Sequence, residues 1–230
     1  LKLPRRLEEK QIRKLGRELA RFHQACTNIC NQLPNPSKNV VTDIHNLMKS
    51  VNKREIKMCD NHKDLVLKHC DIFLNNADKV NYLTEFETIP VFIDWNIGNF
   101  SIDSTGKFFS RWDYDWFRMS SRVMDFYFFS RVVSDAGDRT VFSYLVDPLM
   151  EDRFMVFLKE YHRIFPLTEP EVRFIIEAYR FFILNYVIKD GPYFFRKTYS
   201  NKLVKEAYDT YFPAIDSNYN VEKILRTLKI

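Results

Sequence analysis

Residues 90–102 read PVFIDWNIGNFSI and residues 107–115 read KFFSRWDYD, with the turn-forming residues DSTG between them. This pattern predicts two short apolar strands, each of which ends at a carboxylate, Asp94 in the first and Asp113 in the second. The turn signals between 101 and 106 would fold the second strand back beside the first. Asp94, Asn99 and Asp113 would then meet at one end of a β-hairpin.

The spacing of these three polar residues suits one kind of chemistry. Asn99 follows Asp94 by five positions and Asp113 lies 14 positions further on, which is how kinase-type phosphotransferases place one base and the ligands of Mg²⁺. An Asp beside a transferring phosphoryl group orients the acceptor and takes its proton. Amide and carboxylate oxygens hold Mg²⁺ against nucleotide phosphates. Asp94 is therefore the candidate base, and Asn99 and Asp113 are the candidate ligands of Mg²⁺ and nucleotide.

An internal control shows that spacing by itself is weak evidence. Asp71 and Asn76 have the same separation inside a segment that reads as helix. Asp94 and Asn99 differ from that pair in their context, because a buried type of strand precedes Asp94 and Gly98 lets the backbone approach a ligand.

The carboxylates after the second strand have a simpler interpretation when each is taken singly. Asp113 and Asp115 are then ordinary turn residues. Asp115 stays open between a second metal ligand and a cap of the following helix. Taken in order with Asp94, Asn99 and Asp125, the set favours the kinase-type site.

The run FIDWNIGNF at 92–100, followed by DYD at 113–115 and DF at 125–126, resembles the aminoglycoside phosphotransferase and choline kinase-like family. The family pattern reads H-G-D-x-x-x-x-N, then D-W-E, then D-L-A. The resemblance implies that Asp94 is the catalytic base, that Asn99 and Asp113 bind magnesium and the nucleotide phosphates, and that Asp125 is a buried carboxylate supporting the catalytic loop. Residues 15–23, LGRELARFH, are similar to a family helix ending in L-A-x-x-H.

Two departures from the family pattern shape the expected domain organisation. Phe92 stands where the family has His, so other groups must fix the loop. No Gly-rich phosphate loop and no V-A-I-K-like strand precede the first helix. We therefore expect residues 1–230 to form a single carboxy-terminal lobe, with the nucleotide-binding small lobe missing upstream.

Helical periodicity covers most of the remaining sequence. Expected caps are Thr42, Asp147, and a capping box formed by Thr168 and Glu171. The expected helices cover 6–33, 42–51, 61–76, 122–134, 148–165, 169–188, 200–212 and 220–228. The predicted fold class is α+β, a mostly helical large lobe of a protein-kinase-like fold with a small β-hairpin carrying the active residues.

Composition limits the alternatives. The 230 residues are 46% apolar, with 21 Phe and 12 Tyr against 5 Gly, which favours a filled helical interior. The four cysteines lack metal or disulfide spacing and read as reduced core thiols of a cytoplasmic protein. The five histidines, His23 among them, have no partner pattern and are assigned no chemistry. Scattered charges with a net +5 argue against nucleic acid, and no apolar run is long enough to span a membrane.

The sequence thus predicts a phosphotransferase that moves the γ-phosphoryl group of ATP, or of GTP, to a hydroxyl of a small molecule with Mg²⁺ as cofactor. A pseudokinase or regulatory domain that keeps the fold without catalysis is the alternative. A helical interaction domain that binds no nucleotide is a third interpretation, which leaves the ordered carboxylates unexplained. Aromatic groups between Tyr179 and Tyr199 read as packing rather than as a substrate site. The acceptor and the oligomeric state stay open.

Overall fold

The computed structural model describes residues 3–34, 36, 39–56, 58–135 and 143–230. The helices are α1 (Glu9–Ile29), α2 (Val40–Asn52), α3 (Asp60–Lys79), α4 (Tyr82–Glu85), α5 (Phe126–Val133), α6 (Asp152–Ile164), α7 (Glu169–Phe182), α8 (Gly191–Phe194), α9 (Lys197–Glu206), α10 (Phe212–Asn218) and α11 (Val221–Leu228). The strands are β1 (Ile89–Val91), β2 (Phe100–Ile102), β3 (Phe108–Arg111) and β4 (Arg118–Ser120). The predicted class, a mostly helical α+β fold, is confirmed.

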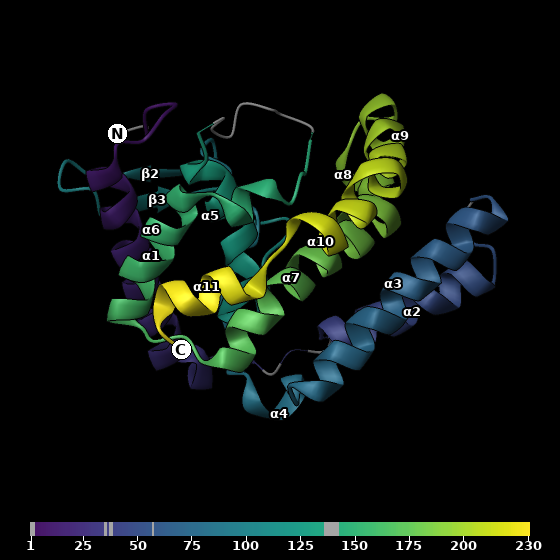
Figure 1. The fold of residues 1–230 in the computed structure, drawn as a ribbon, viewed down its shortest axis with the longest axis horizontal. Helices are drawn as coiled ribbons and strands as arrows, with labels where there is room; N and C mark the ends of the chain where they lie inside the picture. The colour runs from purple at the N-terminus through teal and green to yellow at the C-terminus, as the bar shows by residue number, and fades with distance from the viewer. Residues whose placement is uncertain (1–2, 35, 37–38, 57, 136–142) are drawn as a thin grey trace.

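Figure 1 shows how these elements are arranged. Helices α1, α5 and α6 gather beside the β2–β3 hairpin, and α7 crosses the middle of the molecule. The pair α2 and α3 runs side by side along the opposite edge. Two π-helical turns interrupt the C-terminal part, Ile183–Lys189 after α7 and Ala207–Tyr211 after α9.

Helix α1 is fixed by local capping and by one close contact with α6. Glu8 and Gln11 form a capping box at its start, and the apolar stripe that includes Leu15 and Leu19 is buried. Gly16 lies where the two helices meet: a Cβ there would stand 2.4 Å from the carbonyl oxygen of Phe157. Glycine is therefore needed for the backbones to approach this closely.

The strand pairing differs from the predicted hairpin. β1 pairs antiparallel with β4, and β2 pairs antiparallel with β3. The turn at Asp103 and Gly106 was predicted correctly. It pairs β3 with β2, however, and not with the strand that precedes Asp94. β1 ends just before a left-handed residue, Ile93, and takes its partner from beyond Asp113.

Of the three caps expected from the sequence, one is confirmed. The Thr168–Glu171 capping box is present at the start of α7. Asn39, not Thr42, caps α2 and accepts a hydrogen bond from the backbone N–H of Thr42. Asp147 was wrongly predicted as the cap of a long helix, because 147–150 forms a 3₁₀ turn and α6 begins only after Glu151.

The cysteines are free thiols, as predicted. Cys26 and Cys70 are buried, and burial raises the pKa of each to about 12. Cys59 is exposed, so the expectation of a core position was wrong for it. Over the residues that the structure describes, no helix combines the length and hydrophobicity that crossing a membrane requires.

Candidate active site

The loop that carries Asp94 begins with a strained backbone. Ile93 has a φ of 61°, a left-handed conformation that is unfavourable for a β-branched side chain. The buried carboxylate of Asp125 stabilises this turn, because its Oδ1 accepts hydrogen bonds from the N–H groups of Phe92 at 2.9 Å and Ile93 at 2.7 Å. Strain of this kind persists only where surrounding contacts hold it, and it is concentrated at functional sites.

Asp125 is held in turn by α1 and α6. Its Oδ2 lies 3.0 Å from Nε2 of His23, whose Nδ1 lies 2.7 Å from the hydroxyl of Tyr161. Both ring nitrogens are satisfied when His23 donates from Nε2 to the carboxylate and accepts the proton of Tyr161, and burial raises the pKa of that phenol. His23 is a residue that sequence reasoning missed, although the L-A-x-x-H end of its helix was a signal.

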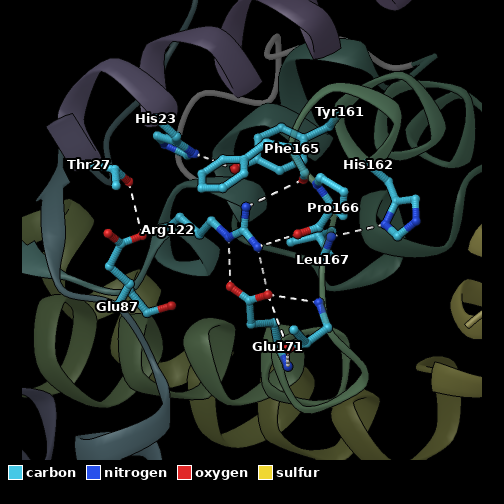
Figure 2. A network of polar contacts seen from close by, with 12 residues as sticks. His23, Thr27, Glu87, Arg122, Tyr161, His162, Phe165, Pro166, Leu167 and Glu171 are labelled. Atoms are coloured by element: carbon cyan, nitrogen blue, oxygen red, sulfur yellow. Dashed lines mark hydrogen bonds and ion pairs between the residues drawn. The ribbon is translucent and has the colours of Figure 1, made fainter.

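The 3₁₀ turn Arg122–Asp125 is tied to the start of α7 (Figure 2). Arg122 donates to both carboxylate oxygens of Glu171, from Nε at 2.6 Å and Nη2 at 2.7 Å, and to the carbonyl of Pro166. Its guanidinium stacks 3.8 Å from the ring centroid of Phe165. Glu171 also closes the α7 capping box, so this pair fixes where Asp125 stands.

Asp94 faces a cavity of about 500 Å³ that contains most of the predicted site. Three carboxylates, one guanidinium and four aromatic side chains contribute to its wall. The lining residues are Asp94, Asn96, Ile97, Gly98, Asp113, Asp115, Trp116, Arg131, Tyr144, Phe194 and Phe195. The structure thus brings Asp94, Asp113 and Asp115 together around one space.

Asn99 contacts Asp94 rather than lining the cavity. Its Nδ2 donates to Oδ2 of Asp94 at 3.0 Å and to the backbone carbonyl of Asp94 at 3.4 Å. The amide oxygen of Asn99 takes no part in these two bonds, and an amide oxygen is a type of ligand that Mg²⁺ accepts. Asn96 donates to the other carboxylate oxygen of Asp94, from its side chain and from its backbone N–H. Both oxygens of Asp94 are therefore oriented by neighbouring amides.

Asp113 and Asp115 are exposed, and their carboxylates accept no hydrogen bond from the residues that the structure describes. Unpartnered oxygens of this type suit a hard cation such as Mg²⁺. Among the described residues, no three His, Cys, Asp or Glu side chains are grouped as a self-sufficient metal site. A bound Mg²⁺ would therefore need oxygens from other sources, such as the Asn99 amide, water and phosphate.

The aromatic wall combines Trp116 and Tyr144, from two loops, with Phe194 and Phe195 at the end of α8. The ring of Trp116 packs 4.9 Å from Tyr186 and 5.6 Å from Phe194, measured between centroids. The backbone of Tyr144 is held at both ends, because its carbonyl accepts from the hydroxyl of Tyr179 at 2.7 Å and its N–H donates to the hydroxyl of Tyr211 at 2.9 Å. Tyr179 and Tyr186 are buried, as the packing interpretation expects, whereas the next segment supplies two lining residues.

Comparisons with known proteins agree with this geometry at the level of the fold. No protein-family model matches the sequence, and a search of curated proteins finds no significant match. The structure is similar to the ADP-bound crystal structure of aminoglycoside phosphotransferase APH(2'')-Ib, with a TM-score of 0.50 and 18% identity over 91% of this chain. It is also similar to the aminoglycoside phosphotransferase from Alicyclobacillus acidocaldarius subsp. acidocaldarius DSM 446, with a TM-score of 0.53 and 11% identity over 96% of this chain.

This chain spans 66% of the length of each of these two proteins. The resemblance expected from residues 92–126 is confirmed in the fold, which is that of the mostly helical part of an aminoglycoside phosphotransferase.

Proposed function

We propose that this chain forms the catalytic lobe of a phosphotransferase that moves the γ-phosphoryl group of ATP, or of GTP, to a hydroxyl of a small molecule. The observation that carries the proposal is the cavity wall shared by Asp94 and Asp113, with Asn99 hydrogen-bonded to Asp94. Two solved structures with this fold are named as aminoglycoside phosphotransferases, and one of them is ADP-bound.

Each side chain has a separate part in this proposal. Asp94 orients the acceptor hydroxyl and takes its proton as the phosphoryl group leaves the nucleotide. Asn99 and Asp113 would hold Mg²⁺, which would neutralise charge on the nucleotide phosphates. Asp115 serves as a further oxygen ligand, and Asp125 keeps the loop in its bent form.

The character of the cavity favours one class of acceptor. Three carboxylates attract positive charge, and aromatic faces bind cations through their π-electrons. Trp116 and Tyr144 line the same cavity, and the Tyr144 ring already has a cation beside it, since the guanidinium carbon of Arg131 lies 4.8 Å from its centroid. A hydroxylated amine would satisfy both features, with its hydroxyl at Asp94 and its charged nitrogen nearer the aromatic wall.

The Asp94→Asn variant tests the proposal, because it keeps the shape of the side chain and removes the proton acceptor. We expect turnover with Mg²⁺·ATP and an amino alcohol or aminoglycoside to fall about 10²-fold or more, with little change in nucleotide affinity. Asp71→Asn is the matched control, since Asp71 has the same spacing to an Asn but lies exposed on α3. Equal turnover in Asp94→Asn and wild type would remove Asp94 from the role of base.

A non-catalytic, pseudokinase-type domain is the second candidate. The observation in its favour is Phe92, which stands where the family pattern has His. Titration with ADP, with and without Mg²⁺, separates the two candidates. Affinity that rises with Mg²⁺ and transfer to an acceptor support the enzyme, whereas binding without transfer to any acceptor supports the regulatory domain.

A further inference from the structure

Arg111 connects the two halves of the candidate site. It is the last residue of β3 and stands two positions before Asp113. Its Nη2 donates to the backbone carbonyl of Asp94 at 2.9 Å, and its Nη1 donates to the backbone carbonyl of Asp113 at 2.7 Å. One rigid guanidinium therefore joins the loop of the candidate base to the loop of the candidate metal ligand.

Aromatic rings hold this guanidinium in place. Its carbon atom lies 4.3 Å from the ring centroid of Phe92, 5.1 Å from that of Trp95 and 5.2 Å from that of Tyr114. Each of its hydrogen bonds to the described residues ends at a backbone carbonyl, and its Nε has no partner among them. Arg111 is thus held by stacking on aromatic rings. It links the backbones of two loops rather than forming an ion pair with one carboxylate.

The backbone needs such a bridge because it is strained on both sides. Ile93, next to Asp94, has a φ of 61°, and Asp113 itself has a φ of 65°. Neither residue is a glycine, and the strain is greater at the β-branched Ile93, because Asp is one of the residues that tolerate the left-handed region. Asp125 contacts the first of these turns. Arg111 contacts both.

We propose that Arg111 is a positioning residue that sets the distance between Asp94 and Asp113, with Phe92 as the surface on which it stacks. The assignment of those two carboxylates to base and metal ligand rests on the proposed function. The bridge itself is a property of the fold. A lysine cannot replace it fully, because an ammonium is a single point charge and lacks the fork that reaches two carbonyls in fixed directions.

The charge of Arg111 adds to this effect. Burial lowers the pKa of its guanidinium, and the negative charges of Asp125, Asp94 and Asp113 act in the opposite direction. The group therefore also places positive charge between the carboxylates that the bridge holds. Removing it would loosen both loops and increase the repulsion between Asp94 and Asp113.

The test compares Arg111→Met and Arg111→Lys with the wild-type chain. Hydrogen–deuterium exchange of the amides in 92–99 and 112–115 should become about tenfold faster or more in Arg111→Met, the factor expected for two lost hydrogen bonds. The exchange rates in Arg111→Lys should lie between those of Arg111→Met and the wild type. Tryptophan fluorescence gives a second signal, because Trp95, Trp112 and Trp116 are the three tryptophans of the chain and all lie in this region.

Arg153 provides a matched control. It also donates to two backbone carbonyls, those of Val133 at 2.6 Å and of Leu7, but at a site that does not line the cavity. Arg153→Met should leave exchange in 92–99 and 112–115 unchanged. In the active protein, Arg111→Met should lower kcat about 10²-fold with a much smaller change in the KM for the acceptor, and Lys should restore part of kcat.

The outcomes separate this inference from the proposed function. Unchanged exchange in both loops in Arg111→Met and Arg111→Lys would overturn the bridge. Faster exchange in only one loop would also overturn it, since the bridge requires both to loosen together. A third outcome would leave the bridge standing and refute the proposed function. In it, both loops exchange faster in Arg111→Met, and the wild-type chain transfers no phosphate to any acceptor.

Discussion

His23 and Asp125 are 102 residues apart in the sequence, yet Nε2 of the first lies 3.0 Å from Oδ2 of the second. Both side chains are wholly inaccessible to solvent. The other oxygen of Asp125 accepts two backbone hydrogen bonds from the loop of Asp94. The position of the candidate base is therefore set by the N-terminal helix, through one buried carboxylate.

Replacing Asp125 should destabilise the whole chain. Asp125→Ala leaves two loop N–H groups and one ring nitrogen of His23 without an acceptor, and we expect the free energy of unfolding to fall by about 3–5 kcal/mol. Urea denaturation followed by circular dichroism measures this difference. Asp71→Ala, on the exposed face of α3, is the control and should change stability by less than about 0.5 kcal/mol. A loss as small as the control's would contradict the supporting role.

Replacement by alanine should lower the stability of the protein at one glycine, Gly16, and leave it unchanged at another, Gly98. Gly16→Ala places a methyl group 2.4 Å from the carbonyl of Phe157, so α1 and α6 must separate, and we expect a loss of about 1–3 kcal/mol despite the higher helix propensity of alanine. Gly98→Ala meets no atom within 4 Å, so its effect on stability should be near zero. Thermal unfolding of the two variants checks the contrast. A stabilised Gly16→Ala protein would mean that the helices are not in close contact there.

Stability should fall with acidification through His69. Burial lowers the pKa of His69 to about 3, with the charges of Arg180 and Lys68 acting in the same direction, whereas the unfolded chain titrates near its ordinary value of about 6.5. Between these two values the unfolded state binds the extra proton, so the free energy of unfolding decreases as the pH falls from about 6.5 toward 3.

A His69→Gln variant checks this assignment. Glutamine cannot titrate, and its side-chain oxygen can still accept from Nη1 of Arg180, as Nδ1 of His69 does. Urea denaturation at intervals between pH 7 and 4 should therefore show a shallower slope in His69→Gln than in the wild type. Equal slopes in the two proteins would assign the acid sensitivity to other groups.

The two exposed carboxylates of the cavity should differ in their effect on metal dependence. Asp113→Asn should raise the Mg²⁺ concentration needed for half-maximal nucleotide binding by about tenfold or more, because it removes a charged ligand. Of the two interpretations left open for Asp115, the helix cap is wrong, because β4 follows it and Ser121 precedes the next helical turn. Asp115→Asn tests the other: a similar rise indicates a second ligand, and no rise excludes that role. Calorimetric titration of Mg²⁺·ADP provides the measurement. An unchanged Mg²⁺ requirement in Asp113→Asn would exclude that side chain from the metal site.

What the sequence predicted well was local. The Thr168–Glu171 capping box needs only residues three apart, and the turn at Gly106 needs only a left-handed backbone. The grouping of Asp94 with Asp113 was also predicted, and both line one cavity. The strand pairing that brings the two carboxylates together was predicted wrongly, since β1 pairs with β4 rather than with β3.

The features that sequence reasoning missed depend on distant partners. The L-A-x-x-H pattern marks His23 but not its partners, because Asp125 and Tyr161 lie 102 and 138 positions away. Arg111 was given no role from the sequence, because its guanidinium reaches back 17 positions to the carbonyl of Asp94. Periodicity and spacing describe one element at a time, so contacts of this kind are beyond them.

The same buried carboxylate has a consequence for biosynthesis. The order of synthesis follows the sequence: His23 leaves the ribosome first, then the loop of Asp94, then Asp125 and last Tyr161. Ile93 cannot stay in its left-handed conformation until all of these have met, because nothing else described around it accepts both loop N–H groups. The nascent chain therefore carries a relaxed loop for much of its synthesis, and the candidate site is assembled only when α1 and α6 dock together.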